Sequence, residues 1–239
     1  MTHFAASSYP SLRHIGLFSE IDDEEMTAIS QRCRWQSFEK GQRILDKGSR
    51  TREVYFVVQG HATIVTYSPG GKEITLAIAG PGDFFGELAA IDERPRSASA
   101  VAIDALDLGI MSHEIFLEVM RRYPSVALKL LTHLAHLVRN SGMRILELST
   151  LPAAQRVYAT LLRMSQKDAA VPQLWVIRPL PPMHEIASLT STTRETVSRS
   201  LSQLYPTGIV KKKGRNLYIM DRQKLTDLVQ SIEAYTSTH

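Results

Sequence analysis

Five polar residues in the last quarter of the chain have the types and the spacing to contact the edges of DNA bases. Apolar residues at positions 197, 201 and 204 recur at helical intervals, which predicts the buried stripe of a helix that Thr192 would cap. The other face of this helix would carry Thr193, Arg194, Glu195, Ser198 and Arg199. Arginine can donate two hydrogen bonds to guanine, and glutamate can accept one from cytosine. The segment therefore predicts a recognition helix for the major groove, running to about Leu204.

The segments on either side of this helix complete a DNA-binding arrangement. Residues 183–189 read as a shorter helix with its apolar residues turned inward, and residues 190–192 supply a polar turn. Residues 208–219 predict two short strands around a basic turn that carries Lys212 and Arg215. Cations in such a wing suit phosphate contacts, which position a protein on DNA without reading its sequence.

A second interpretation of Glu195 stays open at this point. Thr192 and Glu195 have the spacing of a capping box, in which the glutamate bonds to the backbone at the start of the helix. In that arrangement Glu195 would stabilise the helix and would not contact a base.

The distribution of charge agrees with a nucleic-acid partner at the C-terminal end. Residues 151–239 contain 12 Lys and Arg against 6 Asp and Glu, whereas residues 1–150 contain 16 against 18. A basic domain gains affinity for DNA because neutralising phosphates releases counterions. The net charge of +4 for the whole chain hides this asymmetry.

The first half of the chain has the pattern of a short helix followed by an antiparallel β-domain. Asp22 would cap the helix, and Met26, Ile29 and Cys33 would share one face of it. From about residue 35 onward, apolar or alternating segments are separated by glycines, and they comprise residues 53–58, 61–67, 73–79 and 99–103. Strands of this length with turns at this spacing predict an antiparallel barrel or sandwich.

A long helix should follow, from Pro124 to about Ser149. Within it, residues at spacings of three and four form a heptad seam typical of a helix that pairs with its own copy, namely Ala127, Leu130, Leu134, Leu137, Ser141, Arg144 and Leu148. The alternative is a helix packed on its own domain. Leu151-Pro152 would break the helix, and a further helix at about 153–167 and a strand at 174–177 would follow.

Several classes of protein are excluded or disfavoured. No apolar run is long enough for a membrane span, and residues 1–8 do not resemble an export signal, so we expect a cytoplasmic protein without a membrane partner. The single cysteine, Cys33, cannot form an intramolecular disulfide or hold an iron–sulfur cluster, and we expect no metal. Neither a glycine-rich phosphate loop nor a pair of nucleophile and base is present, so we expect no enzymatic activity.

Nearly the whole chain resembles the cyclic-AMP receptor protein/FNR (CRP/FNR) family. The resemblance is carried by Ile186-Ala187, Thr193–Arg199, Leu204 and Gly208–Val210. It implies an α+β protein with a cyclic-nucleotide-binding, jelly-roll-like β-roll at 1–120, a dimerisation helix at 121–150 and a winged helix-turn-helix at 151–239. It also implies a homodimeric transcription regulator in which Arg194, Glu195 and Arg199 read palindromic DNA with half-sites similar to TGTGA, and a contact with RNA polymerase.

The same resemblance points to an effector site in residues 82–98. A cyclic nucleotide has a phosphate charge and a ribose hydroxyl, so its pocket needs a close backbone approach, a carboxylate and a cation. Gly86, Glu87 and Arg96 supply these groups, the Ser97 hydroxyl can add a bond to the phosphate, and Leu88 belongs to the same segment. A bound cAMP or cGMP would act as allosteric effector. The alternative is a salt bridge between Glu87 and Arg96 in a barrel without effector.

The choice of nucleotide base would depend on the long helix. By resemblance, Ser141 corresponds to the residue that contacts the adenine amino group, and Gly142 replaces a neighbouring hydroxyl residue, so both cAMP and cGMP stay open. A cyclic dinucleotide, haem or no effector at all are alternatives, and His61, His133 and His136 could serve as haem ligands. A nucleotide-regulated module that does not bind DNA is the remaining competitor.

Overall fold

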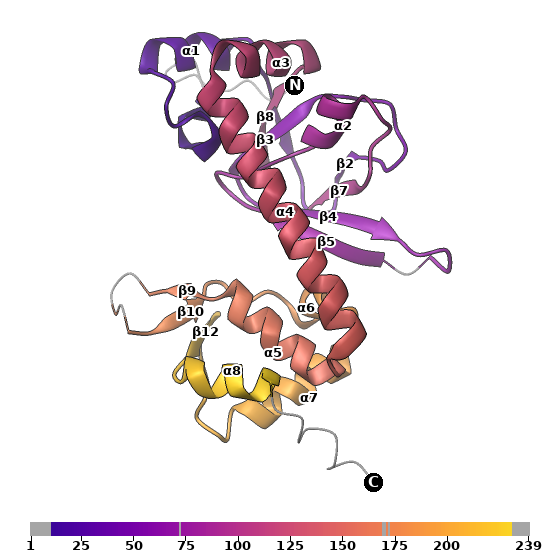
Figure 1. Cartoon of the computed structure of the whole chain (residues 1–239), viewed down its shortest axis with the longest axis vertical. Helices are drawn as coiled ribbons and strands as arrows, with labels where there is room; N and C mark the ends of the chain where they lie inside the picture. The colour runs from indigo at the N-terminus through magenta and orange to yellow at the C-terminus, as the bar shows by residue number, and fades with distance from the viewer. Residues whose placement is uncertain (1–10, 72, 169–170, 172, 231–239) are drawn as a thin grey trace. The chain divides into compact units, whose positions relative to one another are not determined.

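A computed structural model describes residues 11–71, 73–168, 171 and 173–230 of the chain (Figure 1). The described residues fall into two compact units, and the first unit ends at Val138, within a helix that continues into the second.

The first unit opens with short helical segments that cover part of its core. Two 3₁₀ turns, Leu12–His14 and Gly16–Phe18, precede helix α1 (Asp23–Gln31). The Asp22 carboxylate accepts a hydrogen bond of 2.9 Å from the backbone N–H of Glu25, which confirms the predicted cap. Met26, Ile29 and Cys33 are buried together, as the helical spacing predicted.

Two antiparallel sheets of four strands form the β-roll of the first unit. Their strands are β1 (Arg34–Phe38), β2 (Arg43–Leu45), β3 (Val54–Gln59), β4 (Ala62–Tyr67), β5 (Glu73–Ala79), β6 (Phe84–Phe85), β7 (Ser99–Ala102) and β8 (Leu106–Met111). One sheet has the order β1-β8-β3-β6, and the other has the order β2-β7-β4-β5. Buried side chains of both sheets, such as Val57, Leu108 and Ala100, share one core, so the predicted antiparallel sandwich is confirmed.

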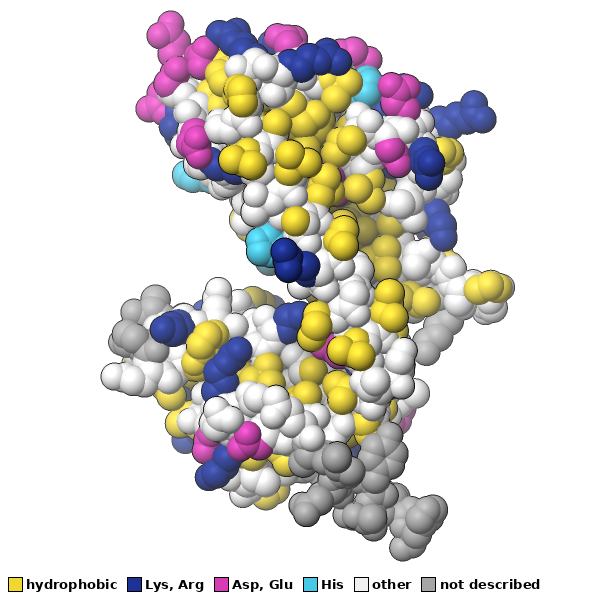
Figure 2. Space-filling view, viewed as in Figure 1, with side chains coloured by type: hydrophobic (Ala, Val, Ile, Leu, Met, Phe, Trp, Pro, Cys, Tyr) yellow, Lys and Arg dark blue, Asp and Glu magenta, His cyan; other side chains and the backbone are white. Residues whose placement is uncertain are grey.

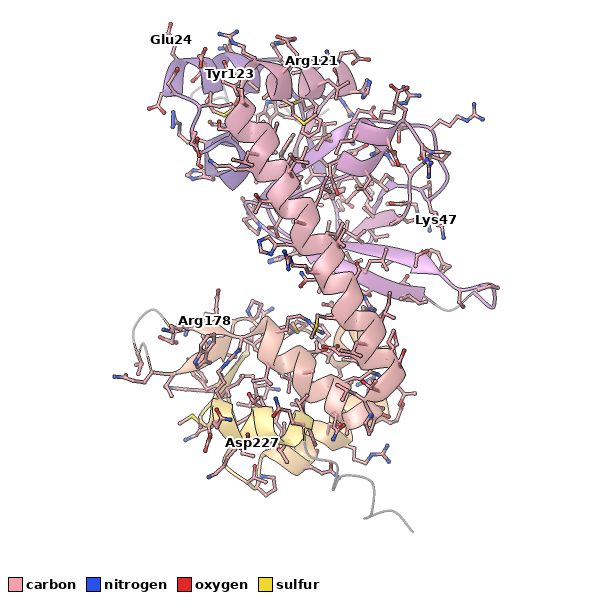
Figure 3. The ribbon with its side chains drawn as sticks, viewed as in Figure 1. Glu24, Lys47, Arg121, Tyr123, Arg178 and Asp227 are labelled. Carbon is pink, nitrogen blue, oxygen red and sulfur yellow. The ribbon has the colours of Figure 1, made fainter. Side chains whose placement is uncertain are left out.

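Three helices complete this unit. Helix α2 (Glu87–Asp92) connects β6 with the segment that leads into β7, and α3 (His113–Arg122) follows β8. The Ser112 hydroxyl caps α3, and Tyr123, labelled in Figure 3, takes an extended conformation that ends it. Pro124 then begins α4 (Pro124–Thr150), because its fixed φ and missing N–H suit the first turn of a helix.

Helix α4 does not present the predicted seam as a free face. Leu130 is buried in the core of the first unit beside Phe116 and Val126, and Leu134 packs against the same core. In the first half of the helix the exposed apolar stripe is offset by one residue and continues through one register, with Leu128, Leu131, Ala135, Val138, Gly142 and Ile145. In the second half Leu137 and Leu148 of the predicted seam are exposed as well, beside Met143 and Leu146. Figure 2 shows hydrophobic side chains along α4. The spacings of three and four are kept, but the seam register predicted from the sequence is wrong for its first half.

The second unit contains a helix-turn-helix and a small antiparallel sheet. After the break at Leu151-Pro152, its elements are α5 (Ala153–Met164), β9 (Gln166–Lys167), β10 (Trp175–Ile177), α6 (Met183–Leu189), α7 (Arg194–Leu204), β11 (Val210–Lys213), β12 (Asn216–Ile219) and α8 (Arg222–Gln230). The sheet has the order β11-β12-β10-β9. The prediction that α5 would reach Lys167 is wrong, because Lys167 pairs with Trp175 at the edge of this sheet.

The helices of the second unit pack around one apolar core. Val157 and Leu161 of α5, Ile186 of α6, and Val197 and Leu201 of α7 are all buried in it. Arg178, labelled in Figure 3, lies next to β10 and donates to the carboxylate of Asp168 at 2.8 Å and to the hydroxyl of Tyr218 at 3.3 Å. The winged helix-turn-helix fold expected from the sequence is therefore present.

Candidate effector pocket and DNA-binding surface

Gly86 starts α2 in a conformation that only glycine adopts without strain. Its φ is +87°, and a Cβ atom at this position would lie 2.7 Å from Nη1 of Arg96 and 3.0 Å from the carbonyl oxygen of Glu53. The lack of a side chain thus lets the backbone approach the arginine closely. The close approach to a bound nucleotide that the sequence predicted for Gly86 stays a prediction.

Arg96 is enclosed by the protein on several sides. Its side chain is 2% exposed, and it donates to the carbonyl oxygens of Gly86 (2.7 Å) and Glu53 (2.8 Å) and to the hydroxyl of Thr51 (3.0 Å). The guanidinium also lies over the ring of Tyr55, 5.6 Å from its centroid. Burial lowers the pKa of Arg96 from its ordinary value, although an arginine stays charged in proteins. The structure therefore holds a buried cation beside the Gly86 backbone.

Glu87 is also buried, with 7% of the residue exposed. Burial raises the pKa of its carboxyl, and its own backbone N–H, His133 and Arg96 offset part of this effect. The alternative salt bridge between Glu87 and Arg96 is not found. Among the described residues, the carboxylate within 4 Å of the Arg96 guanidinium is that of Glu53, at 3.5 Å.

The remaining residues of the predicted ligand set lie in different environments. Leu88 and Ser97 directly follow the buried Glu87 and Arg96 in the sequence. Both are exposed, so Ser97 is accessible to a ligand. Ser141 and Gly142 are exposed on α4 but belong to the second unit. Their part in ligand binding stays a prediction.

The three histidines that could hold haem do not share one environment. Nδ1 of His61 donates a hydrogen bond of 2.9 Å to the carboxylate of Asp104, and His136 is exposed. The ring of His133 lies 4.6 Å from that of Phe84, next to the segment that leads into α2. Of the three, His133 is the histidine that lies near Glu87.

Helix α7 begins one residue later than expected. The Thr193 hydroxyl, and not that of Thr192, accepts the hydrogen bond from the backbone N–H of Thr196, at 3.2 Å. Position 196 therefore takes the capping-box place that the sequence analysis allowed for Glu195. The backbone N–H of Glu195, the Thr193 hydroxyl and the charge of Arg194 lower the pKa of this exposed glutamate.

The exposed face of α7 matches the predicted recognition surface. Val197, Leu201 and Leu204 are buried on one side. The opposite side lines an open hollow of about 420 Å³ formed by Arg194, Glu195, Ser198, Arg199 and Ser202. Neither Arg194 nor Arg199 has a hydrogen-bond or ion-pair partner among the residues that the structure describes. Their donors are therefore free to meet base edges or phosphates.

The wing has the predicted geometry. Val210 to Lys213 of β11 pair with Ile219 to Asn216 of β12, and Gly214 (φ +59°) turns the chain between them. Lys212 and Arg215 are exposed near the tip of this hairpin. The cationic side chains of α7 and of the wing are thus exposed and can contact DNA phosphates.

The residues that position the turn before α7 and the Arg96 side chain were not predicted from the sequence. Arg156 of α5 donates to the carbonyl oxygens of Leu151 (2.9 Å), Thr190 (3.0 Å) and Ser191 (3.4 Å). It thereby ties the end of α4 to the turn between α6 and α7, where Ser191 has a φ of +51°. Thr51, Glu53 and Tyr55 around Arg96 were missed as well, because no local pattern links them to residue 96.

Two protein-family models match the chain, one in each of the two units. The model of the cyclic nucleotide-binding domain matches residues 35–123, and the model of the Crp-like helix-turn-helix domain matches residues 155–228. Among the described residues, no helix is both long enough and apolar enough to cross a membrane.

Two curated proteins and one solved structure illustrate the similarity. The chain is 35% identical over 195 residues to the cyclic AMP receptor protein of Thermus thermophilus, which covers 82% of this chain and 88% of that protein. It is 27% identical over 216 residues to a CRP-like cAMP-activated global transcriptional regulator of Mycobacterium tuberculosis, covering 90% and 96%. The structure of FixK2 from Bradyrhizobium japonicum has a TM-score of 0.71 at 28% identity, covering 82% of this chain and 96% of that one.

Proposed function

Because this chain belongs to the CRP/FNR family of transcription regulators, we propose that it binds palindromic DNA as a homodimer under the control of a cyclic nucleotide. In this proposal residues 1–120 bind the effector, residues 121–150 form the dimer and residues 151–239 bind DNA. The observation that carries DNA binding is the exposed face of α7. It combines a glutamate with two arginines that have no hydrogen-bond or ion-pair partner among the described residues, opposite a fully buried stripe.

The proposed DNA contacts divide into two kinds. Arg194, Glu195 and Arg199, with Thr193 and Ser198 beside them, would contact base edges of TGTGA-like half-sites. Lys212 and Arg215 of the wing would contact phosphates. Base contacts give specificity, whereas phosphate contacts give affinity that falls as the salt concentration rises.

The proposed effector is a cyclic nucleotide with its phosphate near Arg96 and Ser97 and its ribose hydroxyl near Glu87. Support comes from the close approach of Gly86 to a buried arginine beside a buried glutamate. The two curated relatives are named as a cyclic AMP receptor protein and a cAMP-activated regulator, which favours cAMP over cGMP. A cyclic dinucleotide, haem or no effector are the competing assignments for the same domain.

Dimerisation is proposed through the exposed stripe on α4. Leu128 and Leu131 are 65% and 62% exposed, and Val138 and Ile145 are 72% and 66% exposed. Large apolar side chains repeated at heptad spacing gain free energy when a second helix covers them. Two copies related by a twofold axis would present two recognition helices to a palindromic site, about 34 Å apart. A contact with RNA polymerase remains an expectation from the family.

Fluorescence anisotropy with a labelled palindromic TGTGA-type duplex tests this function. Protein is titrated at fixed salt without ligand, with cAMP and with cGMP, and a duplex with scrambled half-sites is the control. We expect tighter and sequence-specific binding with one nucleotide. Equal binding in the three conditions would keep DNA binding and reassign the effector, whereas no preference over the scrambled duplex would contradict sequence-specific regulation.

A further inference from the structure

The phosphate that the proposed function places near Arg96 meets a guanidinium that the protein already uses. Nε donates to Thr51, Nη1 to Gly86 and Nη2 to the backbone carbonyl of Glu53, and the side chain is almost fully enclosed. An arginine has five N–H donors, so only two remain for a ligand. The environment of those two donors therefore decides how well an anion binds.

The side chain of Glu53 lies in that environment. Its Oε2 atom is 3.5 Å from Nη2 of Arg96 and is buried without a hydrogen-bond partner in the described part of the structure. The Glu53 side chain as a whole is 35% exposed, in contrast to 2% for Arg96. The Oε2 atom therefore faces the buried cation, while the Glu53 side chain as a whole is partly open to solvent.

We propose that the Glu53 carboxylate occupies the anion position beside Arg96 and competes with the phosphate of the effector. This inference rests on the proposed cyclic-nucleotide site and assigns to it a residue that determines affinity and specificity. A phosphodiester that approaches Arg96 comes close to a second negative charge, and partial burial weakens the screening of their repulsion by water. The exposed side of Glu53 allows it to swing away, so competition reduces binding but does not block the site.

The contact between Glu53 and Arg96 stabilises the ligand-free protein. A buried guanidinium without a counter-charge would destabilise the β-roll, and Glu53 supplies that charge when no effector is bound. The negative charge of Glu53 lowers the affinity of the site for anions, and this loss of affinity grows with the charge of the ligand. A cyclic nucleotide carries one negative charge, whereas a nucleoside 5′-monophosphate carries close to two at neutral pH, so Glu53 selects against the latter.

Isothermal titration calorimetry of the full-length protein tests the proposal. The wild type, Glu53→Gln and the control Glu39→Gln are each titrated with cAMP, cGMP and 5′-AMP at fixed salt. Glu39 is exposed, belongs to the same unit and has no ion-pair partner among the described residues, so its substitution removes the same charge elsewhere. We expect Glu53→Gln to bind the preferred cyclic nucleotide about three- to tenfold more tightly. The increase in affinity of Glu53→Gln for 5′-AMP should be larger than that for the cyclic nucleotide. Glu39→Gln should bind each nucleotide with the affinity of the wild type.

A double-mutant cycle connects the effect to Arg96. In an Arg96→Gln background, Glu53→Gln should tighten binding much less than in the wild type, because the cation for which the two anions compete is gone and only their direct repulsion remains. Unfolding in urea checks that each variant is folded. If the wild type binds and Glu53→Gln binds equally or more weakly, the inference is overturned and the proposed function stands. If Glu39→Gln tightens binding as much, a general charge effect replaces the inference. If no folded protein binds any nucleotide, both the effector assignment and the inference are contradicted.

Discussion

Arg96 and Gly86 are in such close contact that only glycine fits at position 86. Nη1 of Arg96 donates to the Gly86 carbonyl at 2.7 Å, and a Cβ on Gly86 would lie at the same distance from that nitrogen. The backbone of the loop before α2 and the orientation of the guanidinium therefore depend on each other.

Gly86→Ala should destabilise the first unit and weaken nucleotide binding. The left-handed backbone alone costs an alanine about 1–3 kcal/mol, and the contact with Arg96 adds to this. Gly41→Ala is the matched control, because Gly41 has a similar φ of +81° and open space around its Cβ position. Chemical denaturation should show a larger loss for Gly86→Ala than for Gly41→Ala. Equal losses would mean that the contact with Arg96 has no energetic weight.

Glu87→Gln should stabilise the ligand-free protein at neutral pH. Burial raises the pKa of Glu87, so the folded state favours the protonated form. The contribution of this group to stability is therefore greatest below its unfolded pKa and is lost as pH rises through the folded pKa. Because glutamine does not titrate, the variant should gain stability over the wild type as the pH is raised from about 4 to 7. Urea unfolding across this range measures the difference, and a constant difference would contradict the prediction.

The same variant should bind the cyclic nucleotide about 10- to 100-fold more weakly, because it loses a charge-assisted hydrogen bond to the ribose. Calorimetric titration at neutral pH measures this loss. Unchanged affinity would remove Glu87 from the ligand site.

Thr193→Ala should destabilise the second unit by about 1 kcal/mol, because its hydroxyl caps α7. Thr192→Ala is the control, since Thr192 is the cap expected from the sequence but its side chain does not accept the Thr196 N–H. Thermal unfolding followed by circular dichroism compares the two variants. A larger loss of stability for Thr192→Ala would show that Thr192 caps the helix and would contradict the prediction.

Arg194→Ala and Lys212→Ala should weaken DNA binding in different ways. Removing a base-reading arginine should cost about 1–3 kcal/mol on the matching site and relax the preference at one base pair. Removing a phosphate-binding lysine should weaken binding to all sequences alike and reduce the slope of log affinity against log salt by about 1. Anisotropy titrations over a panel of half-site variants separate the two patterns. A uniform loss for Arg194→Ala would assign it to phosphate.

Leu131→Glu should weaken the dimer, because it places a charge in the exposed apolar stripe of α4. Asn140→Glu introduces the same charge at an exposed position of α4 that lies on the face opposite the stripe. Analytical ultracentrifugation should show a raised dimer dissociation constant for Leu131→Glu only. Dissociation by both variants, or by neither, would contradict dimerisation through this stripe.

Much of the second unit could be predicted from the sequence, because its signals are local. The periodicity of Val197, Leu201 and Leu204 defined the buried face of α7 and hence its exposed polar face. A hairpin wing followed from Gly208 to Ile219 in the same way. The error of one residue at the start of α7 has a local cause, since Thr192 and Thr193 are equally good capping residues and the sequence does not choose between them.

The sequence by itself thus determined which residue types were available: the cation, the carboxylate and the glycine near residues 86–96, and a heptad repeat on α4. Only the tertiary structure decided their partners. Arg96 pairs with Glu53 and not with Glu87, because the folding of the β-roll brings residues 53 and 96 together across 43 positions of the chain. In the first half of α4 the exposed repeat is shifted by one residue for a related reason. The core of the first unit buries Leu130 and packs against Leu134, and this leaves the neighbouring stripe with Leu128 and Leu131 exposed.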